Sequence, residues 1–160
     1  MRNSQFVIVG DNDSRPVMNK DFNLRRISMK KSRFLMLIIS VVVLVLEILP
    51  YGAVCNFANP DGNPIKNVYS YFDLTPFGYA NFGPFITAIL TCVLVVLSIV
   101  FFAKSRKKLS RTIQVISGVS VFTSILPIIY GISYISVIGV IISLLLLSYF
   151  VLSILTNKAE

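Results

Sequence analysis

The sequence contains no histidine and no tryptophan, and its only cysteines are Cys55 and Cys92. Without histidine the chain has no serine–histidine–aspartate triad and none of the common histidine-containing zinc sites. The two cysteines lie too far apart in sequence to form a CxxC redox pair. We therefore predict no enzymatic activity, no cofactor and no metal site.

Acidic residues are also scarce, with 7 Asp and Glu against 15 Lys and Arg, which gives a formal net charge of +8. Such a basic chain could in principle bind nucleic acid. Its basic residues, however, flank long apolar segments instead of forming a separate polar face. Anionic lipid headgroups are therefore the predicted partner of this charge, and we expect no nucleic acid to bind.

Apolar residues make up 55% of the chain, which is more than an ordinary water-soluble domain contains. Four apolar runs account for the excess, and each has about the 20 residues that a helix needs to cross a hydrocarbon core of about 30 Å. These runs are 34–53, 83–103, 112–131 and 134–155. The sequence thus predicts an all-α integral membrane protein, with a four-helix transmembrane bundle over residues 34–155.

The remaining segments are expected to be a polar tail over 1–33, a long loop over 54–82 and a short tail over 156–160. Met29 precedes three basic residues and an apolar run, which is how membrane proteins often begin, so Met1 and Met29 are both candidate starts and residues 1–28 lie upstream of the second. A cleaved signal peptide is the competing interpretation of 34–53. We favour a retained helix, because an h-region has only about 7–15 residues.

The basic residues predict the orientation. Eight precede the first run, five lie in the connector 104–111 and one lies in the C-terminal tail, whereas the long loop contains Lys66 alone. By the positive-inside rule, both termini should be cytoplasmic and the 54–82 loop should lie outside, with the plasma membrane as the expected location.

The long loop is expected to be ordered. Its turn residues at 59–64 lie between two short segments, 54–57 and 65–71, that can pair as a β-hairpin. The loop and its borders are rich in aromatic residues, whereas flexible linkers contain few. Interfacial anchoring is the commonest role of such residues, and a docking surface is the alternative. They are Tyr51, Phe57, Tyr69, Tyr71, Phe72, Phe77, Tyr79, Phe82 and Phe85.

Glu47 is the only Asp, Glu, Lys or Arg inside a predicted span. A charge near the membrane centre costs roughly 2.5–3.5 kcal/mol, so such residues usually face protein or water. Two interpretations remain open. Glu47 is either a proton- or cation-coupling site, or a protonated carboxyl that hydrogen-bonds to a neighbouring helix or to the loop.

Two functions follow from these features. The first is a small non-enzymatic accessory protein that acts through its aromatic outer loop, with another membrane protein or a second copy of itself as partner. The alternative is a small oligomeric transporter that uses Glu47. The candidate functional residues are Glu47, Tyr71, Asp73, Phe77 and Tyr79.

Overall fold

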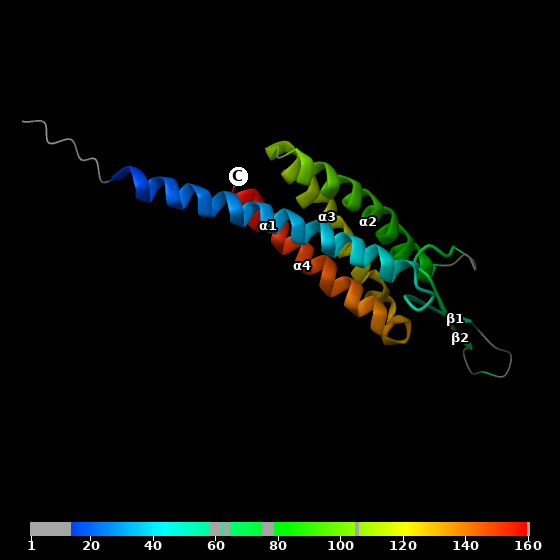
Figure 1. Ribbon diagram of the computed structural model, residues 1–160. Coiled ribbons are helices and arrows are strands. Elements are labelled where there is room, and N and C mark those ends of the chain that lie inside the picture. The colour runs from blue at the N-terminus through cyan, green and yellow to red at the C-terminus, as the bar shows by residue number, and fades with distance from the viewer. Residues whose placement is uncertain (1–13, 58–61, 63–64, 75–78, 105, 160) are drawn as a thin grey trace, which may run out of the picture.

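The computed structural model describes residues 14–57, 62, 65–74, 79–104 and 106–159. Four long helices form a bundle (Figure 1) and are joined in one place by a short sheet. Each helix packs against the next one in sequence, and α4 packs back against α1, which closes the ring. The helices are α1 (Ser14–Ile48), α2 (Tyr79–Ala103), α3 (Lys107–Tyr130) and α4 (Val137–Ala159). The predicted four-helix bundle is confirmed.

Three of these helices are long and apolar enough to cross a membrane. The segments are Phe82–Ala103 in α2, Lys107–Ile129 in α3 and Val137–Lys158 in α4. Many of their large apolar side chains point outward, among them Val96, Phe122 and Leu144. Such a surface is suited to lipid rather than to water. The chain is therefore a small multi-pass integral membrane protein.

The first predicted span differs from the other three, because α1 does not meet the same criteria. The apolar part of α1 runs from Phe34 to Ile48, which is roughly 22 Å of helix, less than the hydrocarbon core of about 30 Å. Helix α1 ends two residues before Pro50, whose ring and missing N–H disfavour a continued helix. At its other end α1 begins at Ser14, within the segment expected to be a tail, and it extends beyond the other helices (Figure 1).

The other boundaries shift by a few residues. Helix α2 begins before the predicted start at Gly83, and α3 includes the second half of the basic connector. The link between α3 and α4 is longer than the predicted two residues, because the 3-10 helix η1 (Ile132–Tyr134) occupies it. Gly131 makes the turn out of α3 with a φ of 128°, a backbone conformation that favours glycine.

The β-hairpin expected in the long loop is present. Strand β1 (Ala53–Phe57) pairs antiparallel with β2 (Ile65–Tyr69), with Ala53 opposite Tyr69 and Phe57 opposite Ile65. The first three residues of β1 are buried, and this strand packs against α2 and η1. By contrast, the first four residues of β2 are exposed. The hairpin is therefore attached to one end of the bundle through β1.

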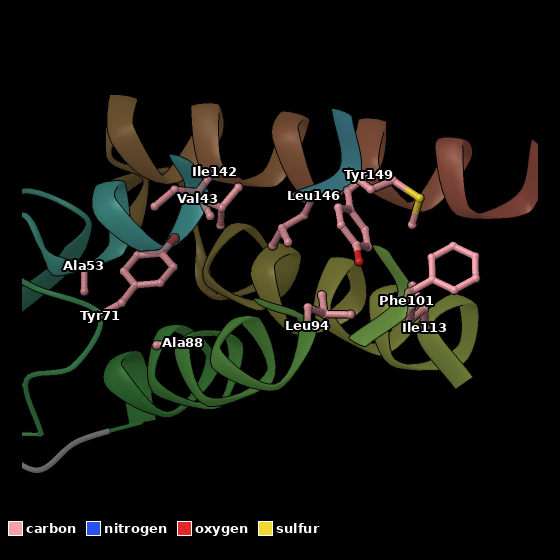
Figure 2. Close-up of a cluster of buried hydrophobic side chains, with 11 residues drawn as sticks. Val43, Ala53, Tyr71, Ala88, Leu94, Phe101, Ile113, Ile142, Leu146 and Tyr149 are labelled. Carbon is pink, nitrogen blue, oxygen red and sulfur yellow. The ribbon is translucent and has the colours of Figure 1, made fainter. Parts of the chain in front are cut away.

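The core lies between the helices and reaches the loop (Figure 2). Apolar side chains alternate there with hydroxyl groups that bond from one helix to another. Thr87 donates to Thr123 at 2.9 Å, and the Ser98 and Tyr149 hydroxyls lie 2.7 Å apart. Small polar residues of this kind let helices approach closely in lipid. The core residues are Met36, Val43, Ala53, Tyr71, Ala88, Leu94, Phe101, Ile113, Ile142, Leu146 and Tyr149.

Candidate functional site around Glu47 and Tyr71

Glu47 faces the interior of the bundle. It follows Met36, Ser40 and Val43 at helical spacing, and all four side chains are buried on one face of α1. Its Oε1 accepts a hydrogen bond of 2.9 Å from the Thr91 hydroxyl on α2. Its Oε2 is buried and has no hydrogen-bond partner among the described residues. Leaving a buried polar atom unpaired costs free energy, so this oxygen is an unusual feature.

The main chain of Glu47 holds the loop in place. The last carbonyl groups of a helix have no partner within that helix. Here the Glu47 carbonyl oxygen accepts a hydrogen bond of 3.0 Å from the Tyr71 backbone N–H and one of 2.9 Å from the Ser70 hydroxyl. The segment that follows β2 therefore caps the end of α1.

Tyr71 inserts from this segment into the bundle and is only 2% exposed (Figure 2). Its ring lies against Gly52, where an added Cβ would stand 2.7 Å from the Tyr71 Cδ1 atom. Its hydroxyl lies beside α4, where a Cβ on Gly139 would stand 3.2 Å from the hydroxyl oxygen. Gly52 therefore has to lack a side chain for the tyrosine ring to fit, and a side chain at Gly139 would crowd the hydroxyl. We call the space between Gly52 and Gly139 the Tyr71 socket.

Burial raises the pKa of the Tyr71 hydroxyl, and the nearby Glu47 carboxyl raises it further. A cavity of about 20 Å³ adjoins the socket and is lined by Tyr71, Ser136 and Gly139 together with residues of α2 and α3. This volume has room for about one water molecule. Glu47 is not among the lining residues and is 0% exposed. Its carboxyl therefore lies in a closed, packed seam.

The structure brings together two of the five candidate residues, Glu47 and Tyr71. Asp73 is exposed, and its backbone N–H donates to the Ser70 carbonyl at 3.2 Å within a turn. Phe77 lies outside the described residues. Tyr79 is the first residue of α2, and its side chain also lies outside the described part.

Three further residues belong to this site and were not singled out from the sequence as candidates. Thr91 and Gly139 stand out in the sequence only as small or polar positions along their helices. Ser70 carries no distinguishing signal, because its role depends on where the loop returns to α1. Within the described ranges, no group of three or more His, Cys, Asp or Glu side chains could hold a metal ion.

Comparison of the chain with protein families, with curated proteins and with solved structures finds no match. Its function must therefore be argued from its own geometry.

Proposed function

We propose that this protein is a non-enzymatic binding partner of another membrane protein and that it binds through the exposed strand of its outer hairpin. The observation that carries the proposal is the contrast between the two strands. Strand β1 is buried against the bundle, whereas Ile65 and Val68 on β2 are 49% and 40% exposed. Apolar side chains presented on a firmly attached hairpin suit recognition better than chemistry.

The outer edge of β2 supports the same proposal. In the described part of the chain, β2 pairs with β1 on one side and with no other strand. An unpaired strand edge offers backbone N–H and C=O groups to an extended segment, which can add as a further strand. The proposed partner is therefore a membrane protein with an extended segment at this side of the bilayer.

The hairpin is fixed well enough to serve as a preformed surface. The Gly52 N–H donates to the Tyr69 carbonyl at 3.1 Å, and the Asn56 side chain donates to the Ser133 carbonyl at 3.3 Å. A surface that is already ordered loses less entropy when a partner binds. A hairpin that became ordered only on binding its partner would not need these contacts with the rest of the protein.

The proposal includes a topology in which both termini are cytoplasmic and α1 completes a fourth pass of the plasma membrane. The distribution of basic residues favours this orientation. The packing of α1 against both α2 and α4 supports its placement beside the three apolar helices. Local thinning of the bilayer or movement of flanking basic side chains toward the headgroups would accommodate its short apolar part.

Site-specific photo-crosslinking in native membranes tests the proposal. A photoreactive residue at Val68 should give a discrete protein adduct, whereas one at Val96, which is 59% exposed on α2, should not. Val68→Asp combined with Ile65→Asp should abolish binding of the identified partner. Because both sites are exposed, each substitution should change the free energy of unfolding by no more than about 0.5 kcal/mol. If the probe at Val68 gives no more adduct than the probe at Val96, the proposal is refuted. If the adduct joins two copies of this chain, the hairpin mediates self-association and does not bind another protein.

A second candidate function rests on the Glu47 Oε2 atom, which has no hydrogen-bond partner in the part of the chain that the structure describes. A buried carboxyl oxygen without a donor is suited to taking up a proton or a small cation, as a coupling site in a transporter requires. Proton uptake into proteoliposomes, followed with a pH dye in the lumen, tests this function. Glu47→Gln should abolish the flux without unfolding the protein, and equal rates in the presence and absence of the protein would exclude the function.

A further inference from the structure

The outer face between α3 and α4 carries a groove of about 650 Å³. Polar residues line one end of the groove, and apolar residues line the rest of it. The residues are Arg111, Gln114, Val115, Gly118, Val119, Phe122, Phe150 and Asn157. Since α3 begins and α4 ends at this side of the bundle, the polar end lies where both helices leave the hydrocarbon region.

The polar end of the groove holds a charged residue and a hydrogen-bonded polar pair. The Asn157 side-chain N–H donates to the Gln114 Oε1 atom at 2.9 Å, which fixes this pair across the two helices. The Asn157 Oδ1 atom is buried and has no hydrogen-bond partner in the described residues. Arg111 is exposed and lies about one helical turn before Gln114. This end therefore offers an exposed positive charge beside a polar pair that is held in place.

The apolar part runs along α3 from Val115 to Phe122, whose side chains are 66% and 64% exposed. Gly118 forms the floor, because an added Cβ would stand 3.3 Å from the Phe150 ring on α4. Any larger side chain at this position would project into the groove or displace that ring. From Arg111 to Phe122 the groove extends for roughly 16 Å along the helix.

We propose that this groove binds one anionic phospholipid molecule. The phosphate pairs with the Arg111 guanidinium, and an acyl chain lies over Gly118 between Phe122 and Phe150. A positive charge and then a hydrocarbon surface follow one another along the groove, as the phosphate and acyl chain of a phospholipid do at the interface. The site is independent of the hairpin and of the function proposed for it.

Native mass spectrometry of the full chain in detergent tests the proposal. Phosphatidylglycerol should remain bound to the protein more strongly than phosphatidylcholine with the same acyl chains. Arg111→Gln should weaken retention of phosphatidylglycerol about tenfold, because a charge-assisted hydrogen bond is lost. Arg106→Gln is the matched control, since Arg106 is an exposed basic residue of the same connector that does not line this groove.

Substitutions that fill the groove distinguish binding of a lipid from binding of a phosphate group alone. Gly118→Leu should reduce retention of phosphatidylglycerol, and Val119→Trp should do the same from an exposed position if the leucine variant does not fold. Neither inorganic phosphate nor glycerophosphoglycerol at the same concentration should compete, because both lack acyl chains. The proposal would be overturned if the Arg106 and Arg111 variants lost phosphatidylglycerol equally, or if inorganic phosphate competed with it. A disulfide-linked dimer formed by Val115→Cys in membranes would overturn it as well, because a second copy would then occupy the groove.

Discussion

Replacing Tyr71 with alanine should destabilise the folded protein by about 3–5 kcal/mol, the usual cost of truncating a buried aromatic side chain. Tyr71 is 2% exposed, and its ring fills the space left by Gly52 and Gly139. The backbone hydrogen bond from Tyr71 to Glu47 is available to alanine too, so the loss measures the side chain. If Tyr71 were instead part of a recognition surface, its truncation would weaken partner binding and leave stability unchanged.

Phe72→Ala is the matched control, because Phe72 is the next residue and is 38% exposed. We expect its truncation to change the free energy of unfolding by no more than about 1 kcal/mol. Tyr71→Phe should lower the free energy of unfolding by an intermediate amount, about 0.5–1.5 kcal/mol, since it removes only the hydroxyl.

The chain has no tryptophan, so unfolding in mixed micelles with increasing SDS is best followed by circular dichroism. Equal losses for Tyr71→Ala and Phe72→Ala would refute the assignment of Tyr71 as a core residue.

Three further predictions concern Glu47, the topology and pH. Glu47→Gln keeps the acceptor for Thr91, so it should lower the free energy of unfolding by no more than about 2 kcal/mol. Glu47→Lys should lower it by at least about 3 kcal/mol in the same equilibrium measurement. A glutamine variant that does not fold would contradict this prediction. A maleimide that cannot cross the membrane should label Lys66→Cys and not Lys107→Cys in intact cells, and the reverse pattern would invert the orientation. Burial, with a smaller effect of Glu47, raises the pKa of Tyr71 above its ordinary value of 10.0, so the unfolded chain releases this proton first as the pH rises. The contribution of Tyr71 to the free energy of unfolding should therefore be fully present below about pH 10 and decrease above it, and Tyr71→Phe should reduce that decrease when unfolding is measured as a function of pH.

The sequence predicted those parts of the fold that depend on local chemistry. The turn residues between positions 59 and 64 predicted the hairpin, and its first strand begins within one residue of the expected position. The second strand ends at Tyr69 instead of Tyr71, because the Tyr71 N–H bonds to the end of α1 and leaves the ladder. This contact joins segments that are distant in sequence, and no local pattern encodes it.

The candidate site was predictable to the same extent. Glu47 stood out because it is the only Asp, Glu, Lys or Arg in an apolar run. The selection of Tyr71 for burial, from nine aromatic residues in and around the loop, was not predictable. It depends on two glycines, Gly52 after α1 and Gly139 in α4, whose joint role appears only once the helices are packed. The shortening of the first span at Pro50 could have been anticipated only in part, because proline disfavours a helix locally and yet Pro84 and Pro127 lie inside α2 and α3.

The Tyr71 socket also has a consequence for the order of assembly. Gly52 leaves the ribosome early, whereas Gly139 belongs to the last helix, so the socket cannot exist until α4 has joined the bundle. Until that moment the segment after β2 has no site for its tyrosine, and the hairpin can be held only by its other contacts. Docking of Tyr71 therefore marks completion of the bundle. A chain that stops before Gly139 would keep this loop open to proteases, and a cell's quality-control machinery could distinguish unfinished molecules from finished ones at this position.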